Sequence, residues 1–193
     1  GAGPGRRLDL TSFERDTGAL ALVCSDAGAA HLGLSARALE AARALLAGGR
    51  FESQRVRWRL VPGDVRETLP REPLAADVVF WDPFSPKANP ELWTVAAFSA
   101  LRGRCGPRAA VFTYSTATAT RAALLLAGFF VGAGDPSGPK QETTVAATDP
   151  ALLARPLDAR WLARLGRSSA PFPQDAPRDA LDRVTAHPQF RAP

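Results

Sequence analysis

The segment from Asp77 to Trp93, DVVFWDPFSPKANPELW, constrains the fold more than any other part of the chain. Its first five residues form an apolar run that predicts a buried parallel strand. The strand ends at Asp82, and three prolines follow within eight residues. Proline fixes the backbone φ angle and disfavours helix in the residue before it, so we expect a stiff loop at the carboxyl end of this strand. In open α/β sheets, ligands bind at that edge.

Strand-like and helix-like segments alternate along most of the chain. Strands are expected at residues 8–13, 56–61, 77–81, 109–114, 129–131 and 143–147, and helices at 16–24, 35–46, 90–101 and 118–127. This alternation predicts an α/β fold with a mostly parallel sheet and helices on both faces. After Pro150 the sequence is rich in proline, with short helices expected at 159–165 and 179–186. We therefore expect a domain of residues 1–150 and a tail, residues 151–193, packed on it.

Length and hydropathy narrow the class of protein. A chain of 193 residues suits one domain with a buried core. Its longest apolar run, residues 122–131, is too short for a membrane span and is broken by Gly128. No charged-then-apolar signal peptide is present. These features predict a cytoplasmic protein without a membrane partner.

Cysteine and histidine are scarce. Cys24 and Cys105 lie far apart and form no CxxC pair, which argues against a disulfide framework or a zinc site. His31 and His187 are the only histidines, which argues against a Ser-His-Asp triad or a multi-histidine metal site. We expect His187 to lie in a turn, and we expect no metal.

The charge predicts attraction to a polyanion. The chain carries 24 basic and 19 acidic residues, a net charge of +5, and only Lys87 and Lys140 are lysines. The arginine bias is also what a GC-rich genome would produce, so charge alone does not identify nucleic acid as the partner. The arginines that could contribute a basic face are Arg6, Arg7, Arg102, Arg104, Arg108, Arg121, Arg160, Arg164 and Arg167.

The first five residues resemble a nucleotide-binding glycine loop. Gly1, Gly3 and Gly5 have the spacing that lets a backbone approach a cofactor closely. Such a loop needs a strand before it and a helix after it, whereas only Arg6 and Arg7 separate it from the next strand. Two interpretations stay open: the first strand and helix of the fold are missing from this sequence, or the glycines are a remnant unrelated to the cofactor.

Acidic residues follow three consecutive predicted strands: Glu14, Asp64 and Asp82. The carboxyl ends of parallel strands meet at one edge of a sheet, so these carboxylates should lie side by side there. An ionised acid suits the two hydroxyls of a ribose, and another can accept from an adenine amine. With Arg15 and Val65 beside them, they predict a site for an adenosyl cofactor. Each acid could instead be a solvated loop residue or a helix cap.

The motif after the third strand favours S-adenosyl-L-methionine over a nicotinamide cofactor. Asp82-Pro83-Phe84 is similar to the (Asp/Asn)-Pro-Pro-(Tyr/Phe) loop of methyltransferases that modify amino nitrogens. Methyl transfer needs the nitrogen lone pair aimed at the methyl group, which an acceptor such as Asp82 can arrange by holding the N–H groups. The ring of Phe84 can favour a sulfonium cation through its face, or can be a core aromatic.

The longer segment resembles one family. DPFSPKANPELW is similar to Asp-Gly-Phe-(Ala/Ser)-Pro-x-x-Asn-Pro-x-(Met/Leu)-Trp of the MnmC-like tRNA (5-methylaminomethyl-2-thiouridylate) methyltransferases. The likeness extends over about residues 8–149, through FTYS at 112–115, AGF at 127–129 and GPKQE at 138–142. One departure is Pro83, where the family usually has glycine.

The resemblance implies a Rossmann-like fold and S-adenosyl-L-methionine-dependent N-methylation of the aminomethyl group on a wobble uridine of tRNA. By position, Asp82 and Phe84 would lie at the reacting atoms, and Glu14 and Asp64 would hold ribose and adenine. The substrate side would be formed by Pro86, Lys87, Asn89, Trp93 and Lys140, although Lys87 could equally be a solvated loop residue. The chain has no room for the flavin oxidase domain that some members carry.

Two other functions remain possible at this point. The same loop could methylate another amine, in a protein or a small molecule. Alternatively, the chain could be a methyltransferase-like domain that binds RNA without turnover.

Overall fold

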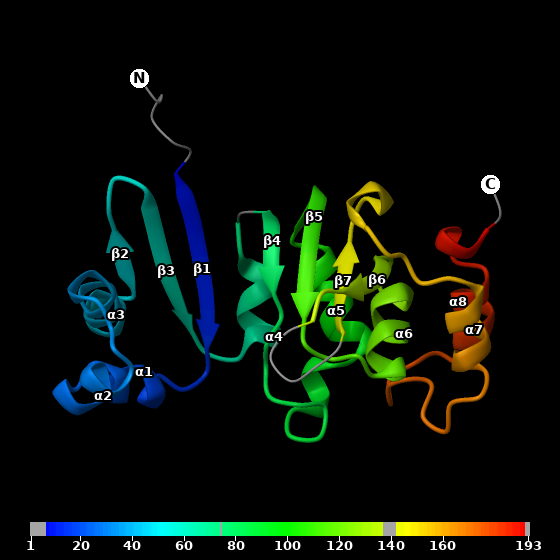
Figure 1. Cartoon of the computed structure of the whole chain (residues 1–193), viewed down its shortest axis with the longest axis horizontal. Helices are drawn as coiled ribbons and strands as arrows, with labels where there is room; N and C mark the ends of the chain where they lie inside the picture. Colours follow the sequence, from blue (N-terminus) through cyan, green and yellow to red (C-terminus); the bar gives the residue numbers. More distant parts are fainter. Residues whose placement is uncertain (1–6, 74, 137–141, 192–193) are drawn as a thin grey trace. The chain divides into compact units, whose positions relative to one another are not determined.

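The computed structural model describes residues 7–73, 75–136 and 142–191. The chain forms two compact units, one ending at Arg71 and one starting at Glu72. We call them unit 1 and unit 2 and describe each by itself (Figure 1). Residues 151–191, the predicted tail, belong to unit 2. A functional division at residue 150 stays a prediction.

Unit 1 contains a three-stranded sheet in the order β1-β3-β2. Strand β1 (Leu8–Glu14) runs parallel to β3 (Val56–Pro62), and β2 (Arg50–Glu52) pairs with β3 in the antiparallel direction. The helical elements of this unit are α1 (Gly18–Val23), α2 (Asp26–His31), α3 (Ala36–Gly48), α4 (Val65–Thr68) and the 3₁₀ turn η1 (Leu69–Arg71).

Helix α3 has the ends that its sequence predicts. The Ser35 hydroxyl accepts a hydrogen bond from the amide of Ala38 at 3.2 Å, which caps the first turn. At the other end Gly49 adopts φ 67°, a left-handed conformation that favours glycine and stops the helix. Ala42 and Leu45 are buried between these ends, so the helix presents one apolar face to the unit.

Unit 2 contains a four-stranded sheet in the order β4-β5-β7-β6. Its strands are β4 (Ala76–Phe80), β5 (Cys105–Thr113), β6 (Phe130–Gly134) and β7 (Thr143–Ala147). Only β4 and β5 are parallel, while β7 pairs with both β5 and β6 in the antiparallel direction. The sheet is therefore mixed rather than mostly parallel, because a short Gly/Pro-rich connection returns the chain directly from β6 to β7.

The helical elements of unit 2 are η2 (Pro90–Leu92), α5 (Val95–Arg102), α6 (Thr118–Leu126), η3 (Pro150–Leu152), α7 (Ala159–Leu165), α8 (Ala180–Thr185) and η4 (Pro188–Phe190). Phe98 of α5, Leu124 of α6 and Val111 of β5 are fully buried and mark the core. On the other face of the sheet, away from Val111, the side chain of Phe80 in β4 is 78% exposed. Its ring stacks on that of Phe112, with centroids 5.8 Å apart.

The helix expected over residues 90–101 is two elements, η2 and α5. The hydroxyl of Thr94 accepts a hydrogen bond from the amide of Ala97 at 3.1 Å and so begins α5. Asn89, which precedes η2, makes no capping bond, and its side-chain amide donates to Glu91 Oε1 at 3.4 Å. Helix α2 and strand β2 were not expected, because six and three residues are too few to establish a period.

The segment after Pro150 is an integral part of unit 2. Residues 155–157 lie beside β6, where Leu157 donates its amide to Val131 O at 2.9 Å. The side chain of Gln189 then accepts from Val131 N at 2.7 Å and donates to Val131 O at 2.7 Å and to Leu157 O at 2.9 Å. Asp175 accepts from the first amides of α5, Val95 and Ala96, at 3.0 and 2.9 Å. These bonds join the end of the chain to the sheet and to α5.

Candidate functional site

The Asp-Pro-Phe loop, residues 81–93, connects β4 to α5. Two aromatic side chains hold the backbone of its motif: the Tyr114 hydroxyl donates to Pro83 O at 2.9 Å, and the Trp93 indole N–H donates to Phe84 O at 2.9 Å. The Trp93 and Tyr114 rings also meet edge to face, with centroids 5.7 Å apart. These contacts fix the loop at two consecutive carbonyl oxygens.

A third aromatic donor fixes the end of the same loop. The Trp81 indole N–H donates to Leu92 O at 3.2 Å. The rings of Trp81 and Trp93 both pack against Phe98, with centroids 5.7 and 6.4 Å from it. The loop is therefore anchored to the core of unit 2 at Phe98. Because its conformation is already restricted, the loop should lose little conformational entropy when a ligand binds.

Asp82 and Phe84 lie on the outer side of this anchored loop. Asp82 is exposed, and its carboxylate makes no hydrogen bond or ion pair with another residue of the described part of the chain. The Phe84 ring is 78% exposed. A stiff backbone thus presents an acceptor and an apolar ring to solvent. The possibility that Phe84 is a core aromatic is excluded.

Tyr114 is a residue of this site that the sequence did not single out. Its pKa is raised, first by loss of solvation and second by the negative charge of Asp82, so the phenol lies within electrostatic reach of that carboxylate. The available signal was its position: the chain's one tyrosine follows β5, the parallel neighbour of β4.

The predicted substrate residues of unit 2 fall into two groups. Pro86 is half-buried, Asn89 is half-buried and contacts Glu91, and Lys87 is exposed. Trp93 is only 3% exposed, so in this structure it supports the loop and does not face solvent. Their roles toward a substrate stay predictions.

In unit 1, Glu14 and Asp64 come together as expected. Glu14 ends β1 opposite Pro62 of β3, and the Gly63 amide donates to Glu14 O at 3.0 Å. Asp64 follows at the same end of the sheet. Arg15 is exposed beside Glu14, and Val65 is half-buried as the first residue of α4.

The carboxylate of Asp64 is already engaged. It caps α4 by accepting from the Arg66 amide at 2.9 Å, and the Arg66 guanidinium donates to both of its oxygens. Hydrogen bonds from Arg66 lower the pKa of Asp64 to about 2. By contrast, the side chain of Glu14 makes no such bond with any described residue and is exposed. Of the two acids, Glu14 has its acceptor oxygens available.

Several predicted residues cannot be placed. Gly1, Gly3, Gly5 and Lys140 lie outside the described residues. Asp82 belongs to unit 2, and Glu14 and Asp64 belong to unit 1. The alignment of all three acids along one edge therefore stays a prediction.

Neither a metal cluster nor a membrane helix is found among the residues described. No three or more His, Cys, Asp or Glu side chains within 7–73, 75–136 and 142–191 gather as a metal ion would require. Over the same ranges, every helix falls short of the length and apolar character needed to cross a bilayer.

Comparison with known proteins gives the family. A family model described as S-adenosyl-L-methionine-dependent methyltransferase matches residues 33–149, more than half of the chain. The chain belongs to this methyltransferase family. The match includes Asp64, the Asp-Pro-Phe loop and Tyr114, so the predicted class of cofactor is confirmed at the level of the family.

A solved structure has the same fold as this methyltransferase. The crystal structure of MNMC2 from Aquifex aeolicus superposes with a TM-score of 0.64, covering 93% of this chain and 68% of that one at 23% identity. At that identity the likeness concerns the fold alone. It confirms the expected methyltransferase architecture.

Curated relatives carry a more specific name. The tRNA 5-methylaminomethyl-2-thiouridine biosynthesis bifunctional protein MnmC of Ralstonia nicotianae is 36% identical over 172 residues, which is 86% of this chain and 24% of the relative. The protein of the same name from Aeromonas hydrophila is 40% identical over 104 residues, 52% of this chain and 15% of the relative. The chain thus spans about a quarter or less of these relatives.

Proposed function

We propose that this methyltransferase transfers a methyl group from S-adenosyl-L-methionine to the aminomethyl nitrogen of a modified wobble uridine in tRNA. The observation that carries the proposal is the anchored Asp-Pro-Phe loop, which presents Asp82 and Phe84 to solvent while aromatic donors hold its backbone. The names of the relatives from Ralstonia and Aeromonas supply the substrate class. A cytoplasmic setting goes with a tRNA substrate and is part of the proposal.

The residues of unit 1 fit an adenosyl cofactor unequally. Glu14 has two carboxylate oxygens available at a strand end, as a ribose diol requires. Asp64 can accept further bonds only beside Arg66, which already donates to both of its oxygens. We therefore propose that the carboxylate of Glu14 binds the ribose hydroxyls and that Asp64 mainly caps α4 and fixes the turn before it. Val65, the first residue of α4, would border the cofactor.

When bound, S-adenosyl-L-methionine supplies an electrophilic methyl group on a sulfonium. In the proposed reaction Asp82 accepts a hydrogen bond from the substrate amine and so orients the nitrogen lone pair. The substrate nitrogen gives up a proton when it takes the methyl group, and Asp82 would receive that proton. The exposed ring of Phe84 would offer its face to the sulfonium cation. The rigid loop keeps both groups in place without reordering.

The deciding experiment is methyl transfer by the purified chain to tRNA that carries the 5-aminomethyl uridine, with the same tRNA lacking the aminomethyl group as control. The proposal predicts one added methyl group per modified tRNA, located at the wobble nucleoside by mass spectrometry. Equal methylation of the control tRNA would refute the assigned acceptor, and binding of tRNA without any transfer would favour the non-catalytic alternative.

A further inference from the structure

A basic pocket lies in unit 2, separate in sequence from the Asp-Pro-Phe loop. It has a volume of about 320 Å³ and is lined by residues of α6, α7 and the β6–β7 region. The charged and aromatic side chains around it are Arg121, Glu142, Arg160, Trp161, Arg164 and Arg167. Four guanidinium groups against one carboxylate leave three positive charges in this space.

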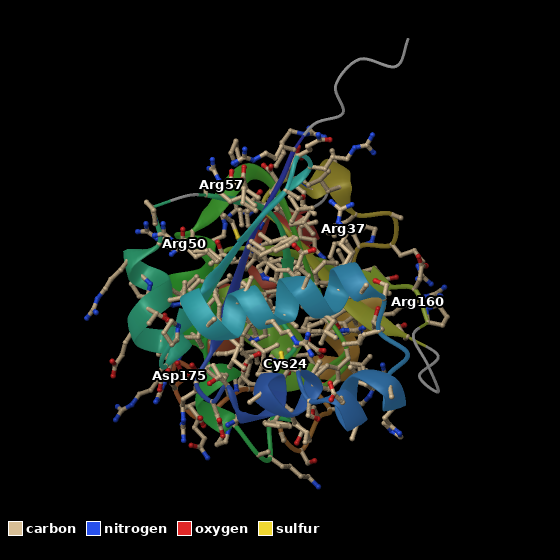
Figure 2. All side chains as sticks on the ribbon, turned by 90° about the vertical axis from the view of Figure 1, so that its left-hand side faces the viewer. Cys24, Arg37, Arg50, Arg57, Arg160 and Asp175 are labelled. Carbon is tan, nitrogen blue, oxygen red and sulfur yellow. The ribbon has the colours of Figure 1, made fainter. Side chains whose placement is uncertain are left out.

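Helix α7 divides its residues between the core and this pocket. Trp161 and Leu165 are 6% and 1% exposed, so they face the interior. Arg160 and Arg164 lie four residues apart on one face of α7. Arg167 follows in the turn after the helix, where its amide donates to Arg164 O at 3.1 Å, and all three arginines are exposed (Arg160 is labelled in Figure 2). Like charges four residues apart on a helix repel one another, so α7 holds Arg160 and Arg164 together at a cost in stability.

These three arginines differ from others of the chain. Arg57, Arg108 and Arg183 each form an ion pair, with Asp9, Asp149 and Asp179 respectively. Within the described ranges, no carboxylate lies within ion-pairing distance of Arg160, Arg164 or Arg167. The acid at the start of the same helix, Asp158, is used as a cap and accepts from the amides of Arg160 and Trp161 at 3.0 and 3.2 Å.

One wall of the pocket is formed by Arg121, whose guanidinium is held in place by hydrogen bonds. Arg121 is 3% exposed; its guanidinium donates to Thr144 Oγ1 and to Thr143 O, both at 3.0 Å, and pairs with Glu142. Glu142 is therefore committed to Arg121 and does not neutralise the arginines of α7. The pocket thus combines the buried, hydrogen-bonded guanidinium of Arg121 with three exposed guanidinium groups that have no carboxylate partner among the described residues. This arrangement suits an anion.

We propose that this pocket binds a phosphate of the tRNA backbone. Guanidinium groups match phosphate oxygens in a bidentate manner, and backbone contacts of this kind position a nucleic acid without reading its sequence. The inference rests on the proposed function for the identity of the RNA. Strand order puts β6 and β4 at opposite edges of the sheet, three strand spacings or roughly 14 Å apart, so the pocket holds the tRNA at a distance from the reacting nitrogen.

The test compares the double variant R164A/R167A with wild type and with R178A, which removes an exposed arginine outside the pocket. Binding of the full chain to purified tRNA is measured by fluorescence anisotropy over a series of salt concentrations. We expect R164A/R167A to weaken binding about tenfold and to reduce the slope of log Kd against log salt by about one per lost phosphate contact. R178A should leave both close to wild type.

A second readout does not depend on the folding of a variant. In the wild-type protein, tRNA should protect Arg164 and Arg167 from phenylglyoxal, as followed by peptide mass spectrometry, and leave Arg178 reactive. Equal protection of Arg178, or equal tRNA affinity of R164A/R167A and R178A, would overturn the proposal. Binding of a phosphorylated peptide with the affinity of tRNA would overturn it as well, because the pocket would then not be an RNA site.

The two proposals can fail separately. If the chain methylates modified tRNA but R164A/R167A binds it normally, the pocket assignment is wrong and the proposed function stands. If the pocket variants lose tRNA binding while wild type transfers no methyl group, the RNA site stands and the catalytic assignment falls. Calorimetric binding of S-adenosyl-L-methionine should be unchanged in R164A/R167A; a large loss would show that the pocket serves the cofactor instead.

Discussion

The Asp-Pro-Phe loop and the segment after Pro150 are both rich in proline and mostly irregular, yet they use their polar side chains in opposite ways. The loop keeps its backbone fixed by Tyr114 and Trp93 and leaves Asp82 without a bond to the described residues. In the later segment, Gln189 and Asp175 themselves make the bonds that attach it to the fold. Proline content predicts irregular backbone in both. A candidate site leaves its polar side chains available to a ligand, whereas residues 151–191, which we call the strap, use theirs to attach the segment to the fold.

The largest expected effect comes from removing the free carboxylate. D82A should lower the rate of methyl transfer by about 10²- to 10³-fold, because the amine loses its acceptor and its orientation. D82N, which keeps one acceptor oxygen, should retain part of the rate. Initial rates with modified tRNA measure this, and the circular dichroism of both variants should match wild type. Near-normal turnover by D82A would refute the role assigned to Asp82.

The strap should respond to the opposite test, in stability rather than rate. Q189A removes three hydrogen bonds and leaves the buried amide of Val131 without this partner, while Val131 O keeps its bond from the Leu157 amide, so the free energy of unfolding should fall by about 2–3 kcal/mol. Urea denaturation gives the value, with the exposed Gln174 as the matched control, Q174A, expected near zero. If Q189A lowers the rate of methyl transfer without lowering the free energy of unfolding, the segment after Pro150 serves the reaction and not only the fold, and the contrast with the Asp-Pro-Phe loop is wrong.

A smaller effect, on both stability and the rate of methyl transfer, is expected at Tyr114. Y114F deletes the hydroxyl that donates to Pro83 O and keeps the ring, so the free energy of unfolding should fall by about 1 kcal/mol. The loop should also become less ordered beside Asp82, with a rate loss of a few fold. If Y114F lowers stability without any change in rate, the tether supports the fold but does not position the reacting groups.

The smallest expected effect is a pH dependence within the strap. Burial lowers the pKa of His187, whose Nδ1 accepts from the Gln189 amide at 3.2 Å and whose ring meets Phe130 and Phe190. Because the unfolded chain then binds a proton more readily than the folded one, stability should decrease as pH falls below the ordinary value of 6.5. H187N should flatten this decrease in melting temperature between about pH 6.5 and 5.

The composition and order of the segment from Asp77 to Trp93 were enough to predict a strand and a stiff loop, and its resemblance to known methyltransferase motifs gave the class of enzyme. It was not enough to show what holds the loop. The donors on Tyr114 and Trp93 depend on packing around Phe98, which local sequence does not contain. For the same reason the cap at Thr94 and the end-to-sheet bonds of Gln189 were missed.

The basic face was predicted only as a list of arginines. The structure separates that list by packing: Arg108 pairs with Asp149, Arg102 lies over the Phe129 ring, and Arg104 donates to Glu72 O at 2.9 Å. Arg160 and Arg164 share one face of α7 because the helical period brings residues four apart together, and Arg167 follows in the turn after the helix. That period was visible in the sequence, whereas the buried charge of Arg121 below them was not.

The tethers of the Asp-Pro-Phe loop end on main-chain carbonyl oxygens, those of Pro83, Phe84 and Leu92. Every amino acid possesses such an oxygen, so these three hydrogen bonds do not depend on which side chains the positions carry. Pro83 also restricts the backbone of the loop, whereas the exposed side chain at position 84 can change while the bonds that hold the loop persist. The surface that the loop presents can therefore change by a single residue, and the three aromatic supports need not change with it.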